Sequence, residues 1–229
     1  ALPIYHTSLL KALPTNNSVI LNEINVNTAF TRTCPIDSEI VIFRKEEWFK
    51  VFIHETFHNF GLDFSDMNLL VCKEKILKIF PVKSDVNLYE AYTECWARII
   101  NAGFVSYHNI DLTKKLNDFL LNMELFINIE RMFAFFQLVK VLKFMGLSYK
   151  NLYGKMNMSD NLRKMLYKEE TNVLAYYIIT GILINNYQDF LFWCETNNTS
   201  LLQFKRIDKN VDLFCSFIVE KYKTKKMLD

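Results

Sequence analysis

The sequence predicts a mainly α fold with a small N-terminal β-sheet, an α+β arrangement. Apolar residues recur at helical spacings of three and four along most of the chain after residue 45, whereas short β-favouring runs occupy the first fifth. The chain has 229 residues and is 51% hydrophobic, so it can bury a substantial core without disulfide support.

The expected sheet consists of residues 18–22 and 39–44, which are separated by a polar stretch ending at Cys34-Pro35. From residue 45 the pattern becomes helical, and Gly61 provides a C-terminal stop. One apolar stripe runs along this first helix: Phe49, Phe52, Ile53, Phe57 and Phe60.

Helical patterns fill the rest of the chain, with stops at Pro81, Gly103 and Gly146. Asp111 is expected to cap a long helix or helical hairpin, and Ser159 or Asp160 to cap a later helix. The expected helical segments are 69–80, 86–102, 111–144, 159–167, 172–186, 187–195 and 211–223.

No internal repeat or linker forces a domain boundary. We expect residues 1–110 to hold the sheet and the chemistry, and residues 111–229 to form a helical region packed on it as one compact unit. The longest apolar stretch, residues 173–184, is too short to cross a bilayer, so no transmembrane segment is expected.

Charge and cysteine content constrain partners and compartment. The net charge is only +2 and the basic residues are scattered apart from a C-terminal lysine cluster, so nucleic-acid binding is not indicated. No C-x-x-C pair occurs among the five cysteines, which favours reduced thiols and an intracellular, cytoplasmic location. The richness in Asn, Lys, Ile, Phe and Tyr is typical of an AT-rich genome and compatible with a viral or virion-associated protein.

The segment His54-Glu55-Thr56-Phe57-His58 matches H-E-x-x-H. Residues i and i+4 of a helix project from one face, so His54 and His58 can bind one cation. Glu55 lies beside them, where its carboxylate can take a proton from a zinc-polarised water and later deliver it to a leaving amine.

A catalytic zinc needs a third protein ligand and an open position for water. The pattern H-E-x-x-H-x-x-G at residues 54–61 resembles the metzincin peptidases, but that family places a ligand where this chain has Phe64, which offers no donor atom. Asp63 and Asp66 are nearby and out of register.

A second pattern resembles the gluzincin metallopeptidases, in which a glutamate on a later helix completes the site. Glu90 and Glu94 share a helical face here, and Ala97 extends that stripe with a small residue that permits close helix approach. The resemblance implies that Glu90 is the third zinc ligand and that Glu94 accepts a hydrogen bond from the outer nitrogen of His54. The two glutamates could exchange roles, and Glu94 could instead pair with Arg98 on an exposed face.

The gluzincin resemblance implies a zinc-dependent metallopeptidase that hydrolyses a peptide or protein substrate, with Glu55 as general base. The strand Ile40–Arg44 could be the edge strand that binds extended substrate, or a plain core strand. A further side chain would stabilise the oxyanion, and the sequence does not choose among Tyr92, Tyr107, His108, Tyr153 and Tyr176.

Three alternatives stay open at this point. His6 and His108 are further possible ligands. The chain could be a non-catalytic helical structural or interaction protein that carries an inactive or accidental motif. It could also be a zinc hydrolase that acts on a bond other than a peptide. Neither the oligomeric state nor the cleavage specificity is readable from the residues.

Overall fold

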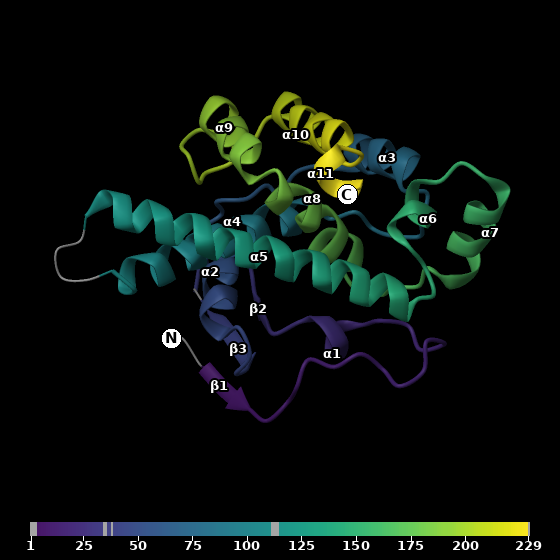
Figure 1. Ribbon diagram of the computed structural model, residues 1–229, viewed down its shortest axis with the longest axis horizontal. Helices are drawn as coiled ribbons and strands as arrows, with labels where there is room; N and C mark the ends of the chain where they lie inside the picture. Colours follow the sequence, from purple (N-terminus) through teal and green to yellow (C-terminus); the bar gives the residue numbers. More distant parts are fainter. Residues whose placement is uncertain (1–3, 34–35, 38, 111–114, 229) are drawn as a thin grey trace.

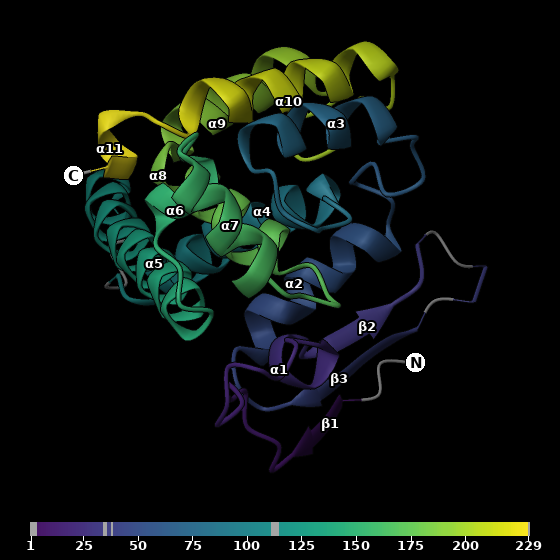
Figure 2. The same cartoon turned by 90° about the vertical axis from the view of Figure 1, so that its right-hand side faces the viewer.

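The computed structural model describes residues 4–33, 36–37, 39–110 and 115–228. It confirms the expected class, because helices dominate and the only sheet of the described residues lies near the N-terminus. Figures 1 and 2 show this sheet on one side of the molecule and the later helices on the other, with α2 (Trp48–Asn59) between them.

The sheet has three strands in the order β1-β3-β2. The central strand β3 (Ile40–Arg44) pairs in parallel with β1 (Ile4–Thr7) and antiparallel with β2 (Ala29–Thr31). Because β3 has a partner on both sides, it is not the edge strand that the sequence suggested for substrate binding. The edge beside α2 belongs to β2, as Figure 2 shows.

The expected strand over residues 18–22 is wrong. The Asn16 side chain accepts a hydrogen bond from the Ser18 amide, and the Asn22 side chain caps α1 (Glu23–Val26). Leu21 makes only an isolated bridge to Glu169. Asparagine side chains that bond to the nearby backbone compete with a strand ladder, and here the turn and the cap prevail over β-propensity.

Helices account for most of the remaining chain. They are α3 (Leu70–Ile79), α4 (Leu88–His108), α5 (Leu116–Phe144), α6 (Tyr149–Tyr153), α7 (Asn157–Leu166), the π-helical turn η1 (Leu174–Ile179), α8 (Thr180–Asn185), α9 (Tyr187–Asn197), α10 (Asp208–Lys221) and α11 (Lys225–Leu228).

The stop at Gly61 is confirmed, and it has a specific geometry. Gly61 has φ +61°, a left-handed conformation that suits glycine. Its amide bonds to the carbonyl of His58, and the Leu62 amide bonds to that of Phe57. This Schellman arrangement ends α2 directly after the second histidine and turns the chain back toward it.

Some predicted helix boundaries are wrong. α4 continues through Gly103, where an added Cβ would meet nothing within 4 Å, so packing of the flanking turns outweighs the low helix propensity of glycine. Ser159 and Asp160 lie inside α7, whose cap is Met156. Of the two alternatives expected before Gly146, the long helix is correct, because α5 is one helix that ends at Phe144. The predicted cap Asp111 lies outside the described residues.

The core surrounds α4, which packs against α2, α5, η1 and α8. One apolar cluster contains buried side chains from Leu21 to Met227 and so includes residues on both sides of position 110. Cys72, Cys95, Cys194 and Cys215 are buried free thiols, whereas Cys34 falls outside the described residues. Over the described ranges, no helix combines the length and apolarity that a membrane crossing requires.

Candidate metal centre

Helices α2 and α4 hold the centre between them. His54 and His58 lie one turn apart on α2, and Glu90 lies in the first turn of α4. The apolar stripe of α2 anchors it to the core through side chains such as Phe57, which is 2% exposed and packs on Trp96 of α4. Packing of these two faces therefore brings the histidines to the start of α4.

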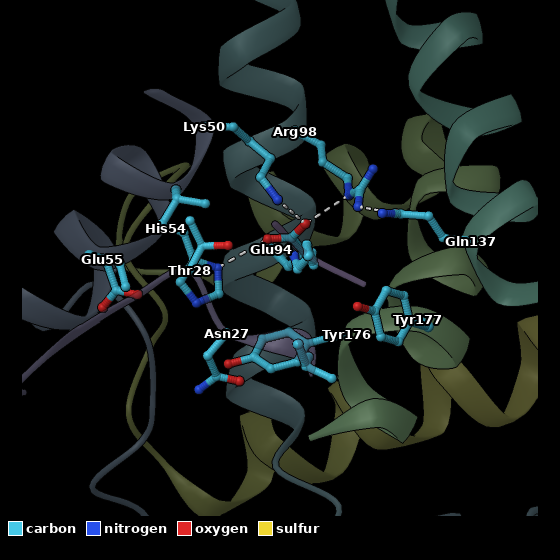
Figure 3. Close-up of a pocket in the computed structure, with 14 residues that line it drawn as sticks. Asn27, Thr28, Lys50, His54, Glu55, Glu94, Arg98, Gln137, Tyr176 and Tyr177 are labelled. Atoms are coloured by element: carbon cyan, nitrogen blue, oxygen red, sulfur yellow. Dashed lines mark hydrogen bonds and ion pairs between the residues drawn. The ribbon is translucent and has the colours of Figure 1, made fainter. Parts of the chain in front are cut away.

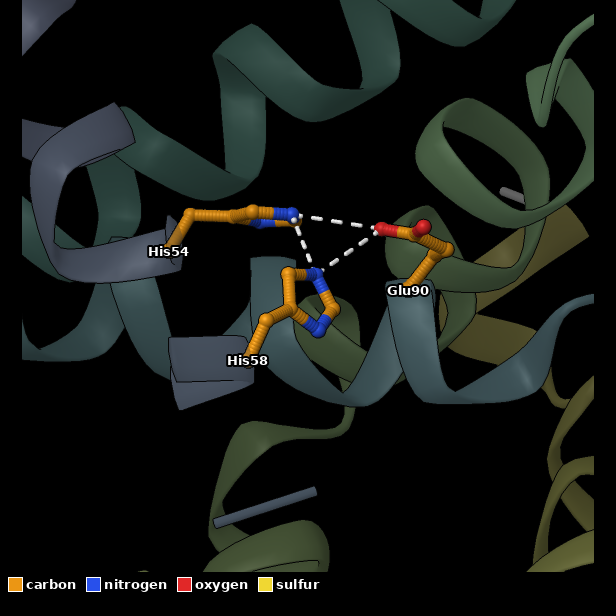
Figure 4. A group of neighbouring side chains, drawn as sticks. All are labelled: His54, His58 and Glu90. Carbon is orange, nitrogen blue, oxygen red and sulfur yellow. Dashed lines mark hydrogen bonds and ion pairs between the residues drawn. The ribbon is translucent and has the colours of Figure 1, made fainter. Parts of the chain in front are cut away.

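Three potential metal-ligand atoms, one each from His54, His58 and Glu90, converge on one point (Figure 4). Glu90 Oε2 lies 3.2 Å from Nε2 of His54 and 3.3 Å from Nε2 of His58. The two Nε2 atoms are 3.1 Å apart. The sequence-predicted ligands are thus together, and Glu90 rather than Glu94 faces both Nε2 atoms.

The outer nitrogen of each imidazole lies against a buried carboxylate. His54 Nδ1 is 3.2 Å from Glu94 Oε2, although the N–H is not well aligned with that oxygen. His58 Nδ1 is hydrogen-bonded to Asp63 Oδ2. A carboxylate at Nδ1 holds the proton there and leaves the Nε2 lone pair facing the centre, which is the tautomer that a metal ligand requires.

The arrangement fits a bound cation. In the tautomer with a proton on each Nδ1 atom, the two Nε2 lone pairs and the Glu90 carboxylate would face one another as three acceptors, and a cation between them would satisfy all three. Two imidazole nitrogens and a carboxylate oxygen form a donor set used by catalytic zinc. The residues that the chain supplies therefore match the ion.

Without a metal, protons compete for the same nitrogens. Burial lowers the pKa of His58, but the Glu90 and Asp63 carboxylates outweigh it and raise that pKa well above the usual value. Burial raises the pKa of Glu90, and the two histidines outweigh it and hold that pKa far below its usual range. Metal binding at this centre must therefore displace protons, and its affinity falls as the pH falls.

Glu55 lies on the other side of His54 from Glu94 (Figure 3). Its carboxyl is mostly buried, and this burial raises its pKa above the usual value despite the opposing effect of the histidines. A carboxylate whose pKa is raised toward neutrality is suited to accept and return a proton.

The structure contradicts the alternative that Glu94 and Arg98 form an exposed pair. Both residues are buried, with Arg98 Nε 3.0 Å and Lys50 Nζ 2.6 Å from Glu94 Oε1. Arg98 also bonds to Glu130 at 2.9 Å. Burial raises the pKa of Glu94, but Lys50 and Arg98 prevail and hold it well below the usual value. Glu94 therefore remains a carboxylate beside His54.

An open cleft of about 680 Å³ lies in front of the centre. Glu55, His58 and Glu90 line it together with the edge strand β2. Tyr89 and Tyr176 contribute aromatic walls. A smaller cavity of about 470 Å³ lies beside His54 on the Lys50 and Arg98 side (Figure 3). Of these two spaces, only the open cleft is lined by all three candidate ligands, His54, His58 and Glu90.

Of the five candidates for oxyanion stabilisation, the structure brings Tyr176 to the centre. Its hydroxyl donates to Glu90 Oε2 at 2.9 Å, and its ring centroid lies 5.9 Å from that of His54. Tyr176 is in the π-helical turn η1, an irregularity that is frequent at functional sites. Burial raises the pKa of Tyr176 well above the usual value, so its hydroxyl remains a donor.

The other candidates lie elsewhere. The Tyr92 hydroxyl donates to the Leu202 carbonyl, Tyr153 packs on Tyr222, and Tyr107 lies near the C-terminal end of α4. His108 is the last residue of α4 and is not among the converging ligands. His6 belongs to β1, and its side chain is outside the described part of the structure.

Three contributors were not assigned these places from the sequence. Asp63 is fully buried and supports His58, Asn172 donates to Glu90 Oε1 at 3.3 Å, and β2 lines the cleft. Only Asp63 carries a local signal, because it follows the Gly61 turn that returns the chain to His58. Phe64 is buried against Phe204, so the ligand position of the metzincin pattern points into the core.

Comparisons with protein-family models, curated proteins and solved structures find no match for this chain. The functional assignment therefore depends on the chemistry of the centre itself.

Proposed function

We propose that this protein is a zinc-dependent metallopeptidase of the gluzincin type. The observation that carries the proposal is the convergence of His54 Nε2, His58 Nε2 and Glu90 Oε2, with each outer imidazole nitrogen against a buried carboxylate. Glu55 opens onto the same cleft as these ligands. This combination supports both metal binding and proton transfer beside it.

His54, His58 and Glu90 would hold the ion. Zinc bound there would act as a Lewis acid toward a carbonyl oxygen and would lower the pKa of a water molecule. Glu94 and Asp63 keep the imidazoles oriented and their Nε2 lone pairs free. The ionised Glu90 balances part of the charge of the ion.

Glu55 is assigned the proton transfers. It accepts a proton from the attacking water and returns it to the amine that leaves when the C–N bond breaks. The Tyr176 hydroxyl, which donates to Glu90 in the absence of substrate, is positioned to donate to the developing oxyanion. Within the described ranges no strand pairs with the outer edge of β2, which would offer backbone groups to an extended peptide chain beside the cleft.

The test combines a peptide-library cleavage assay with three variants. Glu55→Gln should keep stoichiometric zinc and lose turnover, because the amide cannot accept the proton. His58→Ala and Glu90→Gln should lose both zinc and turnover. Full activity in Glu55→Gln would refute the mechanism. Bound zinc with no cleavage of any peptide would favour the non-catalytic interaction protein, and cleavage restricted to other ester or amide substrates would favour a different zinc hydrolase.

A further inference from the structure

The outward face of α5 carries an apolar seam. In Figure 1 this helix crosses the front of the molecule, and in Figure 2 it forms the left edge. The seam residues are spaced alternately by four and three, which is the heptad spacing of a coiled coil. They are between 47% and 69% exposed: Leu125, Ile129, Met132, Phe136 and Val139.

The opposite face of the same helix is already used. Ile127, Ala134, Leu138 and Val141 are buried in the core of this chain. α5 is thus apolar on two opposite faces, and an exposed apolar face of this length indicates an interaction site. Among the described residues, the five seam side chains keep at least 47% of their surface exposed.

The charges at the two ends of the seam are opposite. Asp118 and Glu124 are exposed near its start, and Lys140 and Lys143 are exposed near its end. When two such helices lie antiparallel, the acidic start of each meets the basic end of the other. A face that is complementary to itself under a two-fold rotation fits a second copy of the same chain.

We propose that two copies associate through this seam as an antiparallel helix pair. In this pair, each residue along the seam of one copy lies opposite a residue along the seam of the other copy. The register that pairs opposite charges at the ends and apolar side chains in the middle has these pairs: Asp118 with Lys143, Asn122 with Val139, Leu125 with Phe136, and Ile129 with Met132. Moving the register by one heptad would place Lys143 opposite Leu125 and separate it from Asp118. The charges therefore select the register.

The available area is sufficient for a stable dimer. The five seam residues and the flanking Leu121 and Phe133 are each at least 41% exposed. At about 100 Å² lost per side chain they would bury roughly 700 Å² per copy before the polar flanks are counted. A standard interface buries about 800 Å² per partner. A membrane-surface helix would instead carry basic residues along its whole polar border, whereas the exposed Asp118 and Glu124 border this seam.

Sedimentation velocity over a range of concentrations tests the association. The parent chain should sediment as a dimer, and Met132→Glu should raise the dimer dissociation constant by about 100-fold or more, because the substitution enters the symmetric interface twice. Met132 is 69% exposed, so this change leaves the fold of one copy intact. Phe192→Glu is the matched control, since Phe192 is 70% exposed on α9, away from the seam, and it should leave the dimer unchanged.

Cysteine cross-linking tests the orientation. A mixture of Asn122→Cys and Val139→Cys chains should form the mixed disulfide under mild oxidation, whereas Val139→Cys alone should not, with the parent chain as control for the native thiols. Disulfides between two Val139→Cys chains would overturn the antiparallel arrangement. A parent that remains monomeric at all concentrations would overturn the proposal, and binding of that monomer to anionic phospholipid vesicles would assign the seam to a membrane surface.

Discussion

Asp63→Asn isolates the contribution of the carboxylate behind His58. Asparagine matches aspartate in shape, and its amide oxygen can still accept a hydrogen bond from the His58 Nδ1–H, so the substitution removes the negative charge with little change in packing. Asp63 is fully buried, so this charge acts on the imidazole with little solvent screening. Loss of such a supporting carboxylate typically weakens metal binding by about 10- to 100-fold, which corresponds to about 1.4 to 2.8 kcal/mol.

The assay is zinc competition against a fluorescent chelator at fixed pH. Asp66→Asn is the matched control in the same loop, because Asp66 pairs with Arg206 at the surface and should leave zinc affinity within about twofold. In a His58→Ala background, Asp63→Asn should have no further effect on the residual affinity, since it acts through that imidazole. An unchanged zinc affinity in Asp63→Asn would refute the role that we assign to the carboxylate.

Three further predictions concern the oxyanion, the buried ion network and the partly buried carboxyl of Glu169. Tyr176→Phe should keep zinc affinity within a few fold and lower kcat by about 10- to 1,000-fold in a cleavage assay. Arg98→Met should lower the free energy of unfolding by about 3 kcal/mol in urea titrations, because it leaves the buried Glu94 with Lys50 alone and Glu130 without its partner, whereas Lys164→Met, which breaks an exposed pair, should have little effect. Burial raises the pKa of Glu169 to about 7 from its usual 4.5, so the folded state binds the proton more tightly and stability should fall as the pH rises between these values. Glu169→Gln should remove that dependence and gain about 2 kcal/mol at pH 8, as measured by unfolding at pH 5 and pH 8.

The parts of the centre that depend on local spacing could be predicted from the sequence. His54 and His58 follow from the helical period, and so does the shared face of Glu90 and Glu94. Their convergence required only that two amphipathic helices pack through their apolar stripes. The place of Tyr176 could not be predicted, because it depends on how residues 174–179 return to the centre from the far end of the chain.

In the sheet, too, the sequence predicts what depends on local residues and misses what depends on distant partners. β3 has a β-favouring sequence and was expected, whereas β2 is three residues long and gains its partner only through tertiary pairing. The β-favouring residues 18–22 instead lie between asparagines whose side chains bond to the backbone. Short strands of this kind depend more on neighbours distant in sequence than on their own residues.

The central claim is that His54, His58 and Glu90 form a zinc site, and metal content measures it most directly. Elemental analysis of the chain purified without added metal or a chelating tag should find one zinc per chain in the parent and none in His54→Ala. Absence of zinc from the parent, even after zinc is supplied near neutral pH, would contradict the account.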